Sequence, residues 1–287
     1  MVSRHSAFYS PLIASIAAGF LERRGLEAEY SILAKGQRSG ALIASGAVDI
    51  MQSAVSSNWL PMERGESPLP VHFAQINQRD GFFLVARRPD PTFEWTKLEG
   101  QTVLADHAPQ PLVMVKYAAR SNGLGWARVD AIDAGSPDEM VRAFRGGRGE
   151  YVHLQSPAAH QLEADGVGHV VASVGASMPP VAFSSLCASR EFVASETCRR
   201  FLEAYAESRA WVRTAPPEEV ARAEAAYFEG YSAGALAAAI RRYQALGCWD
   251  GGVEIPGVLY EQALTVFETE GAIARRQPYD AVVGRVL

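Results

Sequence analysis

The sequence is poor in cysteine and in long hydrophobic runs, and both shortages narrow what the protein can be. Its three cysteines among 287 residues leave an odd thiol, and none stands in a C-x-x-C pair of the kind found in many zinc and redox sites. The longest nearly apolar run, Pro11 to Leu21, is shorter than the roughly 20 residues of a membrane-spanning helix. The N-terminus shows no apolar stretch ending in a small-residue cleavage site. We therefore expect no disulfide framework, no membrane helix and no export signal in this chain.

A predominance of charge of one sign is also missing. The chain has 27 basic and 32 acidic residues, interleaved along its length, and a formal net charge of -5. Because nucleic-acid binding needs a basic patch, we exclude a nucleic-acid partner. No Walker loop, G-x-G-x-x-G, H-E-x-x-H or EF-hand motif occurs, and the cysteines and histidines show no metal-ligand spacing. We therefore predict no metal and no cofactor.

What the sequence does contain is a repeated order of predicted elements. The first unit reads as an apolar segment, a helix, an alternating strand, a short helix and a strand, at 5–9, 11–24, 27–33, up to 45–46, and 48–51. The second unit reads as strand, helix, strand, helix and strand, at 102–105, 111–120, 129–133, 138–144 and from 149 onward. Glycines 25 and 123 follow the first helix of each unit and are suited to end it. Two β-α-β-α-β units predict two lobes with mostly parallel sheets and right-handed crossovers.

The remaining segments predict how the lobes are joined. Two strand-like runs cross between the lobes, and the chain after residue 190 is helical, with Ser195 as a candidate helix cap. We predict an α/β protein with a discontinuous first lobe, a second lobe and two crossing strands, at 1–80 plus 190–287, at 90–180, and near 82–87 and 181–188. The crossing strands would form a hinge beside a ligand cleft.

The loops after the predicted parallel strands are the candidate ligand-binding loops, because ligands in open α/β sheets lie beyond the carboxyl ends of the strands. The candidates of the first lobe and its crossing are Phe8, Tyr9, Ser10, Arg38, Ser39, Ser53 and Asn77. Those of the second lobe are Asp106, His107, Gln110, Gln155 and Ser156. We expect the cleft itself to be lined by Tyr9, Ser10, Arg38, Ser53, His107, Gln110 and Gln155.

Several of these candidates also have a purely structural interpretation. The hydroxyl of Ser10 suits a helix cap as well as a ligand contact. One of Phe8 and Tyr9 should face the core, and an Arg at a loop, such as Arg38, is commonly solvated. Ligand contact and structural role therefore both stay open for these residues.

Seven short segments stand in an order that resembles the SsuA/THI5-like (NMT1-like) solute-binding proteins. They are Phe-Tyr-Ser-Pro-Leu at 8–12, Gly-Phe-Leu at 19–21, Gly-Leu-Glu at 25–27, Ala-Ser-Gly-Ala-Val-Asp-Ile at 44–50, Tyr-Glu at 260–261, Gly-Ala-Ile at 271–273 and Tyr-Asp at 279–280. The resemblance implies a type II periplasmic-binding-protein fold and a small polar or planar ligand, such as a sulfonate, a carboxylate, or a pyrimidine or flavin precursor. It also implies an ABC transporter permease as partner and a periplasmic location.

The sequence departs from the family pattern in two places. Many relatives have a Gly-Ser pair after the first strand of the second lobe, whereas this chain has Asp106 and His107 there. The cysteine-rich iron motif of the yeast-type pyrimidine synthases is absent, so that activity is not expected.

Two other functions compete with a monomeric solute-binding protein. One is a cytosolic enzyme of lyase or decarboxylase type on the same fold, and the other is a ligand sensor. The missing export signal favours a cytoplasmic location, whereas the missing acid–base constellation favours binding over chemistry. Asp106 beside His107 resembles a catalytic pair, but no nucleophile is placed next to it. We predict no catalytic residue.

Overall fold

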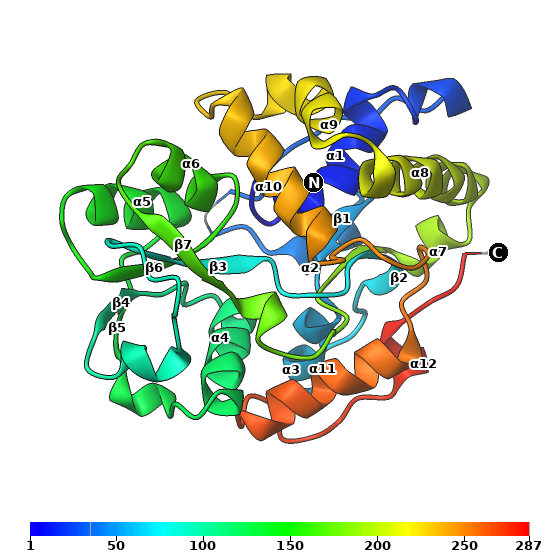
Figure 1. The fold of residues 1–287 in the computed structure, drawn as a ribbon. Helices are drawn as coiled ribbons and strands as arrows, with labels where there is room; N and C mark the ends of the chain where they lie inside the picture. The colour runs from blue at the N-terminus through cyan, green and yellow to red at the C-terminus, as the bar shows by residue number, and fades with distance from the viewer. Residues whose placement is uncertain (35, 287) are drawn as a thin grey trace.

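The computed structural model describes residues 1–34 and 36–286, and its backbone is organised around two β-sheets (Figure 1). The smaller sheet has the strand order β1 (Met51–Ser53), β8 (Ser184–Ala188), β2 (Val71–Asn77). The larger sheet has the order β5 (Asp130–Ile132), β4 (Thr102–Leu104), β6 (Tyr151–Gln155), β3 (Phe82–Ala86), β7 (His169–Ser173). The chain passes from the smaller to the larger sheet between β2 and β3, and returns between β7 and β8.

Within each sheet, all strands except one run in the same direction. Strand β8 is antiparallel to both β1 and β2. Strand β4 is parallel to β5 and β6, and β3 is antiparallel to β6 and β7. The predicted α/β class with mostly parallel strands is confirmed, and the two exceptions, β3 and β8, are the strands that directly follow the two passages between the sheets.

The first predicted unit differs in detail from the structure. No strand ladder forms at 27–33, where Val2 bonds to Ser31 and Leu33 and pairs with Ile32 in an isolated bridge. The segment expected at 5–9 contains a 3-10 helix, η1 (Ala7–Tyr9). The helix expected at 11–24 is shorter, α1 (Ser10–Ala17), because the left-handed Gly19 (φ 73°) follows it before the short η2 (Glu22–Arg24). Gly25 ends η2 in the left-handed conformation, at φ 64°, which glycine adopts readily and which the sequence predicts.

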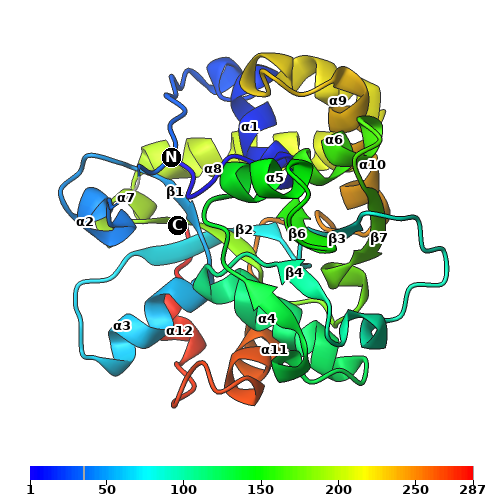
Figure 2. The same ribbon diagram turned by 90° about the vertical axis from the view of Figure 1, so that its left-hand side faces the viewer.

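The helices form layers around the sheets. In both ribbon views α1, α8 (Glu196–Thr214) and α9 (Pro217–Glu224) lie above the sheets, and α3 (Trp59–Glu63), α11 (Gly257–Thr269) and α12 (Tyr279–Val282) lie below (Figures 1 and 2). The other helices are α2 (Ser39–Ala44), α4 (Pro109–Ser121), α5 (Pro137–Arg145), α6 (Ala158–Ala164), α7 (Arg190–Val193) and α10 (Ala233–Ala245). Further 3-10 turns are η3 (Val55–Asn58), η4 (Trp95–Leu98), η5 (Trp126–Arg128), η6 (Val174–Ala176) and η7 (Ala225–Tyr227).

Helix ends follow local sequence signals. The Ser195 side chain accepts a hydrogen bond from the Cys198 amide and caps α8, as predicted. Ser136 and Glu139 form a reciprocal capping box at α5. The helices after residue 190 pack both on the N-terminal helix and on helices that lie among the strands of the larger sheet. Helix α8 contacts α1, α10 contacts α6 and α11 contacts α4.

A buried tyrosine joins three segments between the sheets. The hydroxyl of Tyr243 on α10 accepts from the amide of Ser156 at 2.9 Å and donates to the carbonyl of Gly81 at 3.0 Å. Its side chain is fully buried and its ring lies 5.1 Å from that of Phe8. This one hydroxyl therefore satisfies two backbone groups that would otherwise be buried without partners.

Removing that hydroxyl should be costly. We expect Tyr243→Phe to lower the free energy of unfolding by about 1–3 kcal/mol, because a buried N–H and a buried C=O lose their partner. Urea unfolding followed by circular dichroism measures this. The control is Tyr117→Phe, whose hydroxyl has no hydrogen bond within the described residues, and which should change stability by less than about 0.5 kcal/mol. Equal effects of the two substitutions would contradict the role given to Tyr243.

Candidate ligand-binding cleft

Two of the predicted ligand-binding loops meet between the sheets. The N-terminal segment begins beside β1, where the amide of Gln52 donates to the carbonyl of Met1 at 2.9 Å. It then reaches the end of β6, where the amide of Ala7 and the hydroxyl of Ser6 both donate to the carbonyl of Ser156, at 3.1 and 2.8 Å. The loop after the first segment and the loop after β6 thus lie in contact.

A groove and a smaller cavity lie at this junction. The groove, about 740 Å³, is lined by Arg4, Leu33, Asp106, His107, Ala108, Asp133, Gly135, Ser136, Pro137, Asp138, Glu139 and Arg142. The cavity, about 50 Å³, is lined by Arg4, His5, Ser6, Phe82, Asp106, Pro137, Asp138, Leu154, Gln155, Ser156, Pro157, Ala158 and Tyr231. Since one water needs roughly 10–15 Å³ of such volume, the cavity holds only a few waters. A solute must therefore occupy the groove or push the cavity walls apart.

An ion pair spans the junction. The guanidinium of Arg4 pairs with the carboxylate of Asp106, with side-chain exposures of 20% and 6%. Arg4 also lies over the ring of Phe82, 5.4 Å from its centroid. Burial by itself raises the pKa of Asp106, but Arg4 outweighs burial and the pKa lies below its ordinary value. Asp106 is therefore ionised at neutral pH.

Several polar groups around this pair are buried with unused hydrogen-bonding capacity. Four such atoms, which have no hydrogen-bond partner among the described residues, are both ring nitrogens of His153, Gln155 Oε1 and Asp80 Oδ2. The ring of His153 lies against Phe82, with centroids 4.4 Å apart. Burial lowers the pKa of His153 to about 4, so the imidazole is neutral at pH 7. Burial raises the pKa of Tyr9, while the nearby Arg4 and the side chain of Gln155 lower it in part.

The structure brings together some of the sequence-predicted site residues. Asp106, Gln155 and Ser156 line the cavity and His107 lines the groove. Tyr9 is buried beside Arg4 and Gln155. A ligand contact for these residues stays a prediction, but their positions are suited to one.

Other predicted site residues are engaged elsewhere. Phe8 is fully buried against Phe183 and Tyr243, and Ser10 is hydrogen-bonded to the buried carboxyl of Glu224 at 2.8 Å. The side chain of Asn77 donates to the carbonyl of Phe8, Ser53 bonds to Ser57, and Gln110 bonds to Ser56 and to the carbonyl of Phe183. Arg38 and Ser39 lie at the start of α2, where Arg38 is exposed, and line neither the groove nor the cavity.

Sequence reasoning missed several lining residues. Arg4 lies four residues before Phe8, the first candidate, and as an early positive charge it was the available signal. Asp138 lies in the first turn of α5, beside the capping box. Tyr231 lies between α9 and α10, and no local pattern connects it to residues more than 70 positions away.

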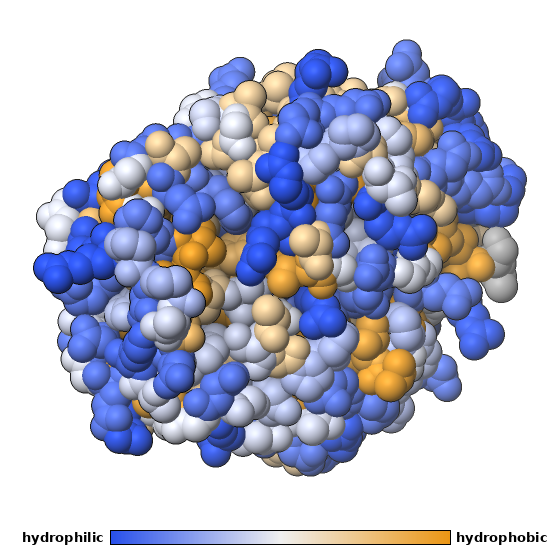
Figure 3. Space-filling view, viewed as in Figure 1, coloured by the Kyte–Doolittle hydropathy of each residue, from blue (hydrophilic) through white to orange (hydrophobic). Residues whose placement is uncertain are grey.

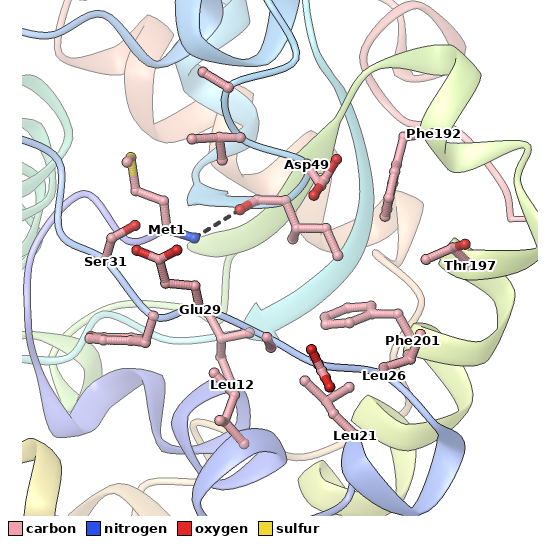
Figure 4. Close-up of a pocket in the computed structure, with 17 residues that line it drawn as sticks. Met1, Leu12, Leu21, Leu26, Glu29, Ser31, Asp49, Phe192, Thr197 and Phe201 are labelled. Carbon is pink, nitrogen blue, oxygen red and sulfur yellow. Dashed lines mark hydrogen bonds between the residues drawn. The ribbon is translucent and has the colours of Figure 1, made fainter.

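A separate pocket of about 490 Å³ lies on the side of the smaller sheet (Figure 4). Its walls include Leu12, Leu26 and Phe201, and Glu29 and Asp49 also line it. The amino group of Met1 donates to the carbonyl of Ile50 within it, at 2.9 Å. Although it is larger than the cavity, no residue of the larger sheet lines it. The junction between the sheets, with its buried polar groups, is the better candidate site.

The three cysteines lie outside the groove and the cavity. Cys187, Cys198 and Cys248 are free and buried. Burial raises the pKa of Cys187 and Cys198 to about 12 and raises that of Cys248 as well, so these thiols are protonated at neutral pH. Among the described residues, no three His, Cys, Asp or Glu side chains come together as metal ligands. Within 1–34 and 36–286, none of the helices has both the length and the apolar character needed to cross a membrane.

Two sheets with a polar cleft between them define a class of two-part α/β ligand-binding proteins. The chain belongs to the NMT1/THI5 like family, whose model matches residues 7–219. A protein of Bacillus subtilis (strain 168) named "Putative binding protein YtlA" is 26% identical over 286 residues, covering 98% of this chain and 85% of that protein.

Solved structures share the fold at low sequence identity. The alkanesulfonate-binding protein SsuA from Xanthomonas axonopodis pv. citri, bound to MOPS, has a TM-score of 0.70 at 13% identity, covering 98% of this chain and 96% of SsuA. The desulfurization enzyme DSZB has a TM-score of 0.66 at 15% identity, covering 99% and 96% of the two chains. The fold therefore occurs both in binding proteins and in an enzyme.

The buried Asp80 yields a test of the electrostatics at this junction. Burial raises its pKa from 3.8 to about 7, so the folded protein binds a proton that the unfolded chain releases between these values. This contribution to stability is fully present below about pH 4 and is lost as pH rises to about 7, up to about 4 kcal/mol. We expect Asp80→Asn to reduce the fall in unfolding free energy between pH 4 and 7.

Urea unfolding at a series of pH values measures this slope. The exposed Asp280→Asn is the control and should leave the slope of the wild-type protein as it is. A slope in Asp80→Asn that equals the wild-type slope would show that Asp80 is ionised in the folded protein at neutral pH.

Proposed function

We propose that the protein is a solute-binding component of an ABC import system, with its ligand held between the two sheets. The observation that carries the proposal is the cleft around Arg4 and Asp106, whose walls come from the N-terminal segment and from the loops of the larger sheet. Family membership and the similarity in fold to the sulfonate-binding SsuA support it. Binding would then be the function, and the protein would make no chemical change in the solute.

The domain arrangement belongs to the same proposal. We assign 1–80 plus 190–287 to one lobe and 90–180 to the other, with the segments near 82–87 and 181–188 as the hinge. Hinge closure of two lobes over a ligand is a common motion in such proteins. Because the cavity is as small as about 50 Å³, a ligand that enters it from the groove would require the lobes to separate. A permease partner and a periplasmic location accompany this function.

The polarity of the surface supports a monomer. Figure 3 shows a face that is mainly polar, with apolar residues in small separate groups. Among the described residues, the large apolar side chains that are exposed are Ile32, Leu60 and Val258, which lie in separate segments of the chain. Obligate dimers usually bury larger and more hydrophobic surfaces.

A second candidate function, hydrolysis or another group transfer, is favoured by one contact. The hydroxyl of Ser156, which lines the cavity, is hydrogen-bonded to Nδ1 of His160. Burial lowers the pKa of His160 to about 4, so its imidazole is neutral at pH 7 and only a weak base. However, the Ser156 amide is already bonded to Tyr243 and is not free as an oxyanion donor.

A thermal-shift screen of sulfonates, carboxylates, pyrimidines, flavin precursors and amines tests the proposal. A ligand at about 100 times its Kd should stabilise the protein by about 2.7 kcal/mol, because only the folded state binds it. Gln155→Ala should weaken a confirmed ligand by about 1–3 kcal/mol if the amide contacts it. The control is Gln101→Ala, whose side chain lines neither the groove nor the cavity.

The outcomes separate the candidates. A ligand that loses no affinity in Gln155→Ala would place the site elsewhere. A solute that is consumed by the wild-type protein but not by Ser156→Ala, as followed by mass spectrometry, would replace binding with catalysis.

A further inference from the structure

The helix that begins beside the cleft offers few free donors to an anion at its N-terminus. Anion sites at helix N-termini use the unpaired backbone N–H groups of the first turn. Helix α4 starts with Pro109, Gln110 and Pro111, and proline has no N–H. The amide of Ala108, just before the helix, donates to Asp106 at 2.9 Å. A carboxylate of the protein itself thus stands where an anionic ligand would bind.

The second helix at the groove is arranged in the same way. Helix α5 starts with Pro137, and its capping box pairs the amide of Ser136 with the carboxylate of Glu139 at 2.6 Å. Ser136 accepts from the amide of Glu139 in return. Asp138 adds a second carboxylate to this first turn. The N-terminus of α5 therefore presents carboxylates to the groove, and the amides of Ser136 and Glu139 are already hydrogen-bonded.

The charged side chains that line the cleft also disfavour an anion, because they carry a net negative charge. Among the described lining residues, the cations are Arg4 and Arg142, and the carboxylates are Asp106, Asp133, Asp138 and Glu139. Arg4 is neutralised by Asp106. Asp133, Asp138, Glu139 and Arg142 are exposed, so salt screens their effect, but the excess of carboxylates repels an anion.

An unused acceptor faces the cavity. Gln155 is 8% exposed and lines the cavity, and its Oε1 has no hydrogen-bond partner among the described residues. Leaving a buried acceptor unpaired costs about 1–3 kcal/mol. A sulfonate or carboxylate offers only acceptors, so it cannot satisfy this oxygen, whereas an N–H group can.

Resting on the proposed solute-binding function, we propose that the cleft takes a small organic cation whose N–H groups donate to the carboxylates of the cleft and to Gln155 Oε1. Sulfonates and other organic anions are excluded. The ligand differs in charge from the alkanesulfonate ligand class of the structural neighbour SsuA.

Matched probes of opposite charge test this. The full chain is titrated by calorimetry and thermal shift with benzamidine and agmatine, with benzenesulfonate and phthalate, and with neutral benzamide. We expect a cation to bind and the anions not to bind. The affinity for the cation should fall when salt is raised from about 0.05 to about 0.5 M, because the attraction is screened.

Two substitutions in the cleft test which carboxylates attract the cation, and one substitution outside it is the control. Asp138→Asn should weaken the cation several-fold, and Glu66→Gln, which removes an equal charge at a separate surface site, should not. Asp106→Asn should weaken the cation by about tenfold and, because Arg4 is released, should permit benzenesulfonate to bind. If Asp106→Asn does not fold, Asp138→Asn and the salt dependence still decide the question.

The results distinguish this inference from the proposed function. Benzenesulfonate binding to the wild-type protein, or benzamide binding as tightly as benzamidine, would overturn the cation specificity and leave solute binding intact. If neither cation binds while an anion or a neutral compound from the wider screen does, the cation specificity is likewise overturned and solute binding is left intact. If no compound of any charge binds, the proposed function is overturned together with this inference.

Discussion

The ion pair between Arg4 and Asp106 is the contact on which the arrangement of the cleft depends. It connects the N-terminal segment to the loop after β4, and Asp106 is almost fully buried. Removing a charge from water costs several kcal/mol, which the attraction to a partner offsets only when the geometry is good. Each of the two groups is therefore poorly accommodated at this depth without the other. We expect the two sides of the cleft to be either closed with the pair formed or open with both charges hydrated.

Uncharged hydrogen bonds determine where this pair is held. The carbonyl of Ser156 accepts from Ala7 and Ser6, its amide donates to Tyr243, and Gln110 bridges Ser56 and Phe183. These bonds are short-ranged and directional, so they align the walls to within a few tenths of an ångström. The charges then determine which ligands the aligned walls admit.

The fold and the chemistry of the site follow different rules in this family. At 13–15% identity, the solved structures keep the arrangement of elements, because many apolar sequences can fill the same core. The ligand is chosen by a few side chains at the strand ends. In this chain those positions carry Asp106 and two prolines at the start of α4, so few backbone N–H groups are free at that helix N-terminus.

The sequence alone determined those features that depend on neighbouring residues. The order of strands and helices in the second unit, the cap at Ser195 and the turn at Gly25 were predictable, because hydrophobic period and capping act over a few residues. The loops of Tyr9, Asp106 and Gln155 could be nominated for the same reason. Tertiary structure alone decided that Ser10 meets Glu224, that Arg4 meets Asp106 and that Tyr231 reaches the cavity. These contacts join residues about 70 to 210 positions apart, and no local pattern records which distant side chain a polar group will meet once the core has packed.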